Sequence, residues 1–503
     1  MSAPWFAFLF RVLRSLAKFR HIRAAQLAKA FRAGLLVCLG NYISPVNAVD
    51  REHGLHRKLR RWQLIMIAMG GAIGVGLFLG SAATIGIAGP GVLITYIFGA
   101  IVAMIIGYAL AEMATVHPVA GSFGVYADQY LSPWAGYAIR VSYWFAQTVA
   151  IGAEITAIGL YFHYWFPEVP SWLWIGGSSV VILTVNAANV EVFGTLESWF
   201  AMVKVVAILA FIILGGALII GIGKPAIGLS NLVAHGGFLP HGWTGVWLAL
   251  TLVITSYVGI EVVAVTAGEA EDPEESVPRA LRSLVIRLII FYVLAIFVIL
   301  AVMPWTTTAE TGGRLTGSPF VKVLGEIGIP FAAGIMNFVV ISAALSSVNT
   351  NLYLCTRMIF SLSRAEYVPR WLGSVDARGV PLVALSASSA GMLAAILLAI
   401  KGQPAFFLLF GTAVAAIFFV WTTILVTHIR FRQALSPERF RALPVKLPGH
   451  PIVSICGILV ILALAVSTVF VEGLQWTVPL FLGWLALITF LYFLRRIRLG
   501  FGG

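Results

Sequence analysis

The sequence predicts an all-α integral membrane protein with twelve transmembrane helices, and three observations support this fold class. Of the 503 residues, 60% are hydrophobic and 11% are charged, whereas a soluble globular protein carries about 25% charged residues. Apolar runs long enough to cross about 30 Å of hydrocarbon recur along most of the chain. These runs are continuous rather than alternating with polar residues, which favours helices over the strands of a membrane barrel.

The expected spans follow one another through short loops, so we treat them as one membrane domain. The third and eighth runs are longer than one bilayer thickness, and we expect those helices to tilt, kink or extend into water. The twelve expected spans are residues 62–83, 91–114, 133–165, 172–188, 198–222, 242–267, 284–303, 329–361, 381–399, 405–428, 452–471 and 476–493.

The distribution of basic residues predicts the orientation of the chain. With both termini in the cytoplasm, cytoplasmic segments collect 28 of the 33 Lys and Arg residues, as the positive-inside rule requires. The net charge of +13 is therefore a topology signal, and no nucleic-acid partner is expected. We expect a multi-pass protein of the inner (cytoplasmic) membrane, in contact with lipid. Cys38, Cys355 and Cys456 lack metal-type spacing, and we expect no metal or cofactor.

A basic leader, residues 1–53, precedes the membrane domain of residues 54–498. Arg11, Arg14 and Lys18 share one helical face, which fits a cytoplasmic interfacial helix on an anionic leaflet. A start codon placed too far upstream explains the same segment equally well. A signal peptide fits less well, because the apolar core is short and a full span follows soon after it.

The first span contains "GGAIGVGLFLG", residues 70–80, with five glycines in eleven residues. Glycine costs a helix about 1 kcal/mol relative to alanine, so this density calls for a reason. A helix break in the membrane interior would use it, because glycine lets the backbone leave the helical region and lets another group approach closely. The alternative is tight helix packing through small residues, and the spacings of Gly70 to Gly74 and of Gly76 to Gly80 fit that too.

The sequence of the sixth span favours a helix break over tight packing as the explanation of the glycines in the first span. It reads "ITSYVGIEVVAVTAGEAEDPEESVPRA", with a polar cluster followed by Gly259 and Glu261. Many transporters consist of two inverted repeats with one interrupted helix in each, and five spans per repeat would make spans one and six equivalent. Half-helix N-termini offer amide donors to an anion, and half-helix C-termini offer carbonyls to a cation. An α-amino acid carries one group of each kind.

Four collinear motifs resemble the amino acid permeases of the amino acid–polyamine–organocation superfamily, and the resemblance extends from Gly54 to about Arg498. The motifs are "GLHRKLRRWQLIMIAMGGAIGVGLFLGSA", "AEMATVHPVAGSFGVYADQYLSPWAGY", "GEAEDPEESVPRA" and "SSVNTNLYLCTRMIFSLSRAEYVPRWL". Within the family, the proline-type and 4-aminobutyrate-type bacterial permeases look most similar. The resemblance implies a 5+5 inverted-repeat core with broken helices 1 and 6, plus two C-terminal helices. It also implies proton-coupled uptake of amino acids.

The same resemblance implies where the substrate binds. Its carboxylate would lie at the amides of Val75 and Gly76. Val75 stands where the family resemblance leads us to expect a small polar residue, which puts a side-chain hydroxyl contact in doubt but leaves the amide contacts. Tyr257 would be an aromatic lid, and its bulk favours a small or cyclic substrate. The implied substrate-binding set is Ala72, Ile73, Gly74, Val75, Gly76, Ser256, Tyr257, Val258 and Gly259, with the amine at carbonyls near Ala72, Ile73, Ser256 and Val258.

Three ionisable residues within the expected spans call for a reason, because a charge at the centre of a membrane helix costs at least about 2.5 kcal/mol on insertion scales. They are Glu154, Lys204 and Glu261, and we expect the coupling proton to be carried among them. In related permeases a lysine on the fifth helix replaces a sodium ion, and Lys204 matches it. We therefore expect its ammonium to reach carbonyls or polar groups near the break in span one. The alternatives are a structural ion pair for Lys204, a helix-break cap for Glu261, and for Glu154 either pairing with Lys204 or an outward position.

Acidic residues at span ends have plainer interpretations. We expect Glu112 to be a solvated cap at the end of span two. The acidic run that ends span six, from Glu269 to Glu275, is either an exposed loop or an inner gate that pairs with basic loops.

These observations favour a secondary active transporter that imports amino acids, by proton symport with alternating access. An amino acid exchanger of the same fold is the alternative. An enzyme is not expected, because the spans contain no close carboxylate pair, metal cluster or nucleophile–base arrangement. A channel fits less well, because it would need rings of charge or exposed carbonyls along a pore.

Overall fold

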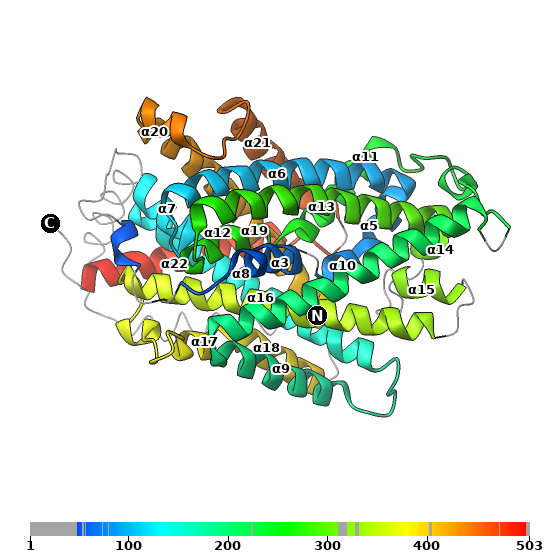
Figure 1. The fold of residues 1–503 in the computed structure, drawn as a ribbon, viewed down its shortest axis with the longest axis horizontal. Coiled ribbons are helices and arrows are strands. Elements are labelled where there is room, and N and C mark those ends of the chain that lie inside the picture. The colour runs from blue at the N-terminus through cyan, green and yellow to red at the C-terminus, as the bar shows by residue number, and fades with distance from the viewer. Residues whose placement is uncertain are drawn as a thin grey trace.

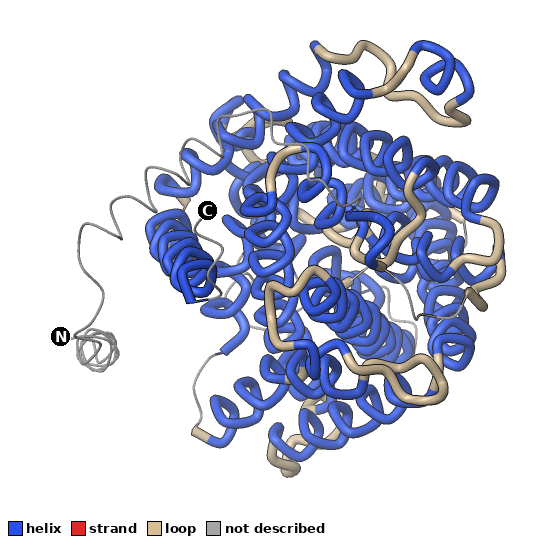
Figure 2. The backbone as a smooth tube through the Cα atoms, turned by 90° about the vertical axis from the view of Figure 1, so that its left-hand side faces the viewer, coloured by secondary structure: helices blue, strands red, loops and turns tan. Residues whose placement is uncertain are grey.

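The computed structural model describes residues 48–52, 55, 57–72, 74–78, 80–222, 225–309, 319–326, 331–401, 405–471 and 473–498. In this part of the chain the secondary structure is helical, and the single β-bridge joins Leu59 to Ala270. Most long helices run along the longest axis of the molecule (Figure 1) and are seen end-on in the perpendicular view (Figure 2). Most of the leader, residues 1–47, lies outside the described residues.

The α-helices have these bounds: α3 Arg61–Ala72, α4 Val75–Phe78, α5 Gly80–Ala88, α6 Val92–Val116, α7 Ser122–Tyr130, α8 Pro133–Phe162, α9 Ser171–Ala188, α10 Val190–Ile220, α11 Gly242–Val253, α12 Val262–Thr266, α13 Pro273–Val302, α14 Trp305–Ala309, α15 Pro319–Glu326, α16 Ala332–Arg364, α17 Leu382–Ser388, α18 Ala390–Ile400, α19 Ala405–Ala434, α20 Pro437–Ala442, α21 Ile452–Ser467 and α22 Thr477–Arg498. Short 3-10 segments are η1 Ala48–Arg51, η2 Gly89–Gly91, η3 Ser230–Leu232, η4 Ile254–Tyr257, η5 Ala267–Glu269, η6 Arg370–Gly373 and η7 Thr468–Phe470.

Ten helical segments of the described chain are long and apolar enough to cross a membrane. Two of the twelve expected spans are missing from this set. The first span is divided into α3, α4 and α5, and the seventh lies in α13, whose apolar part Ile290–Val302 is shorter than a full span. The all-helical membrane class is confirmed, whereas the count of twelve and the 5+5 arrangement stay predictions.

The first expected break is present. Helix α3 ends at Ala72, Gly74 forms a bend, and α4 begins at Val75. Gly76, which belongs to the glycine-rich stretch expected to contain the break, is the second residue of α4. Among the described residues, the interruption between α3 and α4 is at Gly74, because a helical turn resumes at Val75.

The second expected break is also present. Helix α11 ends at Val253, a 3-10 turn follows, and α12 begins only at Val262. Gly259 has a φ of 107°, a conformation that is strained for residues with a side chain. The sequence therefore places a glycine at the one point of this break where the backbone turns left-handed.

The centre of the bundle is formed by α8 and α16, and α8 packs most extensively against α16 and α19. The apolar window of α16 is 89% buried, whereas that of α22 is 17% buried. Helices α8 and α16 have 30 and 33 residues, in agreement with the expected long third and eighth spans. The polar residues of these two helices therefore face the protein interior, where they need partners.

Two acidic residues at span ends are buried, contrary to the simpler interpretation. Glu112, expected to be a solvated cap, is 0% exposed and accepts hydrogen bonds from Arg432 Nε at 2.6 Å and His428 Nε2 at 3.0 Å. Glu269 forms a two-pronged ion pair with Arg357, at 2.7 and 3.0 Å. Both glutamates thus connect helices far apart in the sequence.

The segment before α3 lies against the same end of the bundle. Leu59 N donates to Glu269 O at 3.0 Å, and Glu271 N donates to Leu59 O at 3.1 Å. Glu52 accepts from Gly121 N at 3.1 Å and from Ser361 Oγ at 2.6 Å. Burial raises the pKa of Glu52, although Arg140 acts in the opposite direction. The acidic run is thus not simply an exposed loop, since its first residues bind the segment that leads into α3.

Candidate functional site

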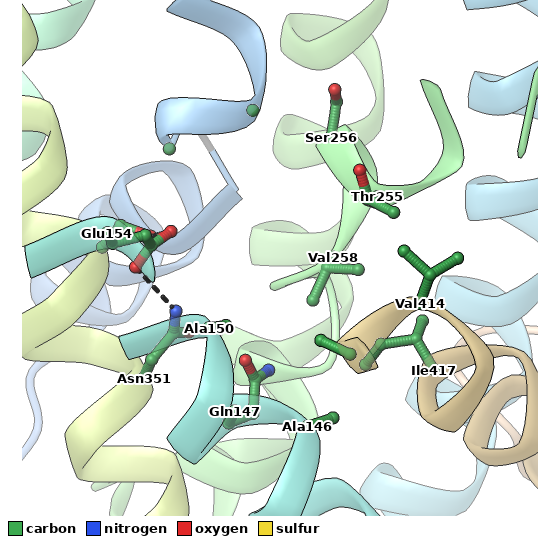
Figure 3. A pocket seen from close by; sticks show the side chains of 14 residues that line it. Ala146, Gln147, Ala150, Glu154, Thr255, Ser256, Val258, Asn351, Val414 and Ile417 are labelled. Carbon is green, nitrogen blue, oxygen red and sulfur yellow. Dashed lines mark hydrogen bonds between the residues drawn. The ribbon is translucent and has the colours of Figure 1, made fainter. Parts of the chain in front are cut away.

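A cavity of about 600 Å³, its mouth included, lies between the two helix breaks (Figure 3). Five elements line it: the first break, α8, the second break, α16 and α19. They belong to the first, third, sixth, eighth and tenth expected spans. The lining residues are Gly74, Gly76, Ala146, Gln147, Ala150, Glu154, Thr255, Ser256, Val258, Ser347, Asn351, Ala413, Val414 and Ile417.

The two glycines of the first break allow close approach. A Cβ atom at Gly74 would lie 2.9 Å from Ser347 Oγ and 3.3 Å from Glu154 Oε1. A Cβ atom at Gly76 would lie 3.4 Å from Cα and Oγ of Ser256 in the second break. The first break therefore contacts α8 and α16 on one side and the second break on the other, and larger residues would separate these elements.

Glu154 is the ionisable side chain among the residues that line the cavity. Its Oε1 accepts a hydrogen bond from Ser347 Oγ at 2.6 Å, and its Oε2 accepts one from Asn351 Nδ2 at 3.1 Å (Figure 3). Both donors come from α16, so the carboxylate of α8 is held in place by neutral groups. It can accept a proton, or attract a cationic group that enters the cavity.

Another part of the wall is mostly apolar. Ala146 and Ala150 of α8 leave room opposite Val414 and Ile417 of α19, and Gln147 reaches into the space between them (Figure 3). Gln147 is 1% exposed, and its Nε2 has no hydrogen-bond partner among the described residues. This amide can donate to a bound molecule, whereas the surrounding side chains suit a hydrocarbon group.

Lys204 lies behind the first break and not in the cavity wall. Its Nζ donates to Gly70 O at 2.6 Å, near the end of α3, and the side chain is fully buried. The expected contact of Lys204 with a carbonyl near the break is therefore present. Glu197 on the same helix is also buried, and its charge interacts electrostatically with Lys204. The sequence analysis missed Glu197, which lies one residue before the expected fifth span.

Glu261 is a cap of the second break. Its Oε2 accepts a hydrogen bond from Gly259 N at 2.8 Å, and its other oxygen accepts one from Trp421 Nε1. The carboxylate is buried and does not line the cavity. This arrangement matches the cap alternative, and Gly259 likewise contributes to the geometry of the break rather than to the cavity wall.

Tyr257 does not lie over the cavity. Its hydroxyl donates to Tyr96 O at 2.7 Å, and its ring stacks on Tyr292 with centroids 5.1 Å apart. Tyr257 is therefore not among the residues that line the cavity in this structure, and its role as an aromatic lid that restricts the substrate stays a prediction. In addition, Ser256 O accepts from Tyr292 Oη at 2.8 Å, so one lone pair of this expected amine ligand is occupied.

The remaining predicted residues belong to the first break. Ala72 ends α3 and Val75 begins α4, but their side chains are not described. Ile73 lies outside the described residues. Among the described residues, no group of three His, Cys, Asp or Glu side chains could hold a metal ion.

A bundle of long apolar helices, two of them interrupted around one partly polar cavity, defines a multi-pass membrane protein with a small-molecule site in its interior. The chain belongs to the amino acid permease family, whose model, described as "Amino acid permease", matches residues 63–497. Membership indicates amino acid transport.

Individual relatives agree with this assignment. The "Uncharacterized amino acid permease YtnA" of Bacillus subtilis (strain 168) is 44% identical over 409 residues, covering 80% of this chain and 87% of the relative. The "Aromatic amino acid transport protein AroP" of Escherichia coli (strain K12) and that of Shigella flexneri are each 39% identical over 455 residues, covering 89% of this chain and 97% of the relative. These names describe transport proteins. The proline-type or 4-aminobutyrate-type subtype is not confirmed.

Proposed function

We propose that this protein imports an amino acid with an uncharged, mainly apolar side chain across the cytoplasmic membrane, by proton symport with alternating access. The observation that carries the proposal is the cavity, which both helix breaks line together with a single carboxylate. In transporters with inverted repeats, interrupted helices of this kind form the substrate site. The proposal includes twelve spans in a 5+5 repeat, with two C-terminal helices and both termini in the cytoplasm.

The zwitterionic part of the substrate would bind at the first break. Its carboxylate would accept from the amides of Val75 and Gly76, as the family resemblance implies. Its ammonium would lie near Glu154, which supplies a negative charge at the cavity wall. Glu154 would add a charged partner to the carbonyls that the family resemblance implies, and charge-assisted hydrogen bonds are about twice as strong as neutral ones.

The side chain of the substrate would point towards Ala146, Ala150 and Val414. Small residues at two of these positions leave room for a ring. Aromatic amino acids are the first candidates, because two relatives carry the name aromatic amino acid transport protein. Gln147 would then contact the far end of the ring.

Coupling would involve the buried charges next to the site. A zwitterion that enters with one proton carries one positive charge, so each 100 mV of inside-negative potential contributes about 2.3 kcal/mol to accumulation. Glu154 at the cavity wall and Lys204, which binds Gly70 O, are the proposed carriers. Glu261 is the weaker candidate, since both of its oxygens are already used to cap the second break. The leader, residues 1–53, is proposed to lie in the cytoplasm.

Uptake into proteoliposomes tests the proposal. Purified protein is given a panel of labelled amino acids, with and without an imposed inward proton gradient. We expect accumulation of phenylalanine, tyrosine or tryptophan above the external concentration only with the gradient, and little uptake of lysine or aspartate. Accumulation that requires a loaded internal amino acid and ignores the proton gradient contradicts symport. Accumulation of charged amino acids alone contradicts the side-chain assignment.

A further inference from the structure

Helix α10 carries a second buried charge two turns before Lys204. Glu197, Ala201 and Lys204 share one face of this helix, and both charged side chains are 0% exposed. We propose that Glu197 is a positioning residue of the transporter, whose carboxylate is the fixed counter-ion that holds the protonated Lys204 on the carbonyl of Gly70. The inference rests on the proposed proton coupling and adds a residue to it.

The carboxylate of Glu197 is held by neutral donors. Asn349 Nδ2 donates to Glu197 Oε2 at 3.0 Å, and Ser346 Oγ donates to Oε1. Asn349 is oriented in turn by Asn186 of α9, whose Nδ2 donates to Asn349 Oδ1 at 2.7 Å. A carboxylate that only accepts satisfies this chain of donors without rearrangement. The positive charge that balances it must come from elsewhere.

Gly70 lies between the two charged side chains. A Cβ atom at Gly70 would lie 2.3 Å from Glu197 Oε1, so a larger residue at position 70 would require the carboxylate to move. The carbonyl of the same residue accepts from Lys204 Nζ at 2.6 Å. One residue of the first span therefore contacts both members of the pair, only four residues before the bend at Gly74.

The charges that act on Lys204 come from two helices. Among the described side chains they are Glu197 of α10, which acts most strongly, and Glu154 of α8. The other elements packed on α10 contribute neutral groups. Helix α16 contributes Ser346, Asn349 and Thr350 near Glu197, α9 contributes Asn186, α3 contributes the backbone of Gly70, and α13 meets α10 through Val298 at Gly215.

This division assigns different tasks to the two carboxylates. Glu154 lines the cavity and is accessible to substrate, whereas Glu197 is outside the cavity wall and keeps its partners when substrate enters or leaves. The fixed carboxylate stabilises the ammonium form of Lys204 throughout the cycle. Without it, Lys204 would lose its proton more readily and release the end of α3.

The pH profile of uptake tests this role. Glu197→Gln keeps the shape and an accepting oxygen for Asn349 but removes the charge. We expect the external pH that gives half-maximal uptake to move at least one unit towards acid, while exchange at acidic pH stays within about threefold of wild type. The matched control is Glu191→Gln, an exposed carboxylate in the first turn of the same helix, which should not move the profile. Glu197→Asp retains the charge and should retain the wild-type midpoint at lower uptake.

An unchanged midpoint in Glu197→Gln overturns the proposal, whatever happens to the maximal rate. Thermal unfolding of the purified protein gives a second test that does not depend on transport. We expect Glu197→Gln and Lys204→Gln each to lower the melting temperature, and the double variant to be more stable than the sum of the two losses, because neither charge is then left unpaired. Additive losses overturn the pairing. Wild-type protein without proton-dependent uptake refutes the proposed symport instead, and the melting temperatures still decide the pairing.

Discussion

Gly76→Val should abolish uptake while the protein still inserts into the membrane. The Cβ atom alone is tolerated, because it would lie 3.4 Å from Cα and Oγ of Ser256, close to ordinary van der Waals contact. Valine adds two methyl groups whose rotation about χ1 is restricted, so one must press on Ser256 or occupy the cavity. Overpacking of this kind costs about 1–3 kcal/mol, which corresponds to about 5- to 150-fold in affinity. Alanine at position 76 should therefore retain most of the binding.

The assay is equilibrium binding of a labelled aromatic amino acid to purified protein, together with uptake in proteoliposomes. Gly80→Val is the matched control, since a Cβ atom at Gly80 would meet nothing within 4 Å. We expect wild-type affinity for Gly80→Val, a small loss for Gly76→Ala and a large loss for Gly76→Val. Wild-type affinity in correctly inserted Gly76→Val would show that the substrate binds elsewhere and would refute the reasoning.

Three further predictions concern single side chains. Lys204→Ala should lose accumulation driven by a pH gradient but keep slow exchange, and Lys204→Arg should not restore accumulation fully because guanidinium does not deprotonate in the working range. Normal proton dependence in Lys204→Ala would leave Glu154 as the leading candidate. Gln147→Leu should reduce the preference for tyrosine over phenylalanine by about tenfold, because a neutral hydrogen bond is worth about 1 kcal/mol and a buried partner is lost. Competition uptake measures the ratio of tyrosine to phenylalanine transport. An unchanged ratio would place the substrate ring elsewhere. Burial raises the pKa of Glu52 above its ordinary 4.5, so docking of the segment before α3 favours the protonated carboxyl. That stabilisation is complete at acidic pH and is lost as the pH rises through the raised pKa. Hydrogen exchange of residues 48–60, corrected for intrinsic rates, should therefore increase with pH in the wild type but not in Glu52→Gln. Equal slopes of exchange rate against pH in the two proteins would contradict the assignment.

The two breaks could be predicted because their cause is local. Glycine density around Gly74 and the polar cluster before Gly259 are visible in a short window of sequence. The contact of Lys204 could be predicted for a similar reason, since a lone charge among apolar neighbours needs a nearby acceptor. Glu197 lies seven residues earlier on the same helical face, next to the polar Ser198. It was missed because α10 begins at Val190, eight residues before the expected span.

The side chains that were misplaced depend on distant partners or on helix phase. Glu112 looks like a terminal cap in sequence, and only the fold brings Arg432 and His428 to it. Tyr257 lies in a 3-10 turn, where the rotation per residue differs from that of an α-helix. Its direction could not be extrapolated from α11, and the ring points to Tyr96 instead of the cavity.

Neighbouring serines on α16 limit how the substrate range of this permease can be engineered. Ser347 donates to the carboxylate at the cavity, and Ser346 donates to the carboxylate behind the first break. We therefore expect a substitution that enlarges the cavity from α16 to disturb the groups next to Lys204 as well, so that a change of selectivity there would carry a penalty in the proposed proton coupling. Libraries for new substrates should leave α16 intact and vary the opposite walls, at Ala146, Ala150 and Val414.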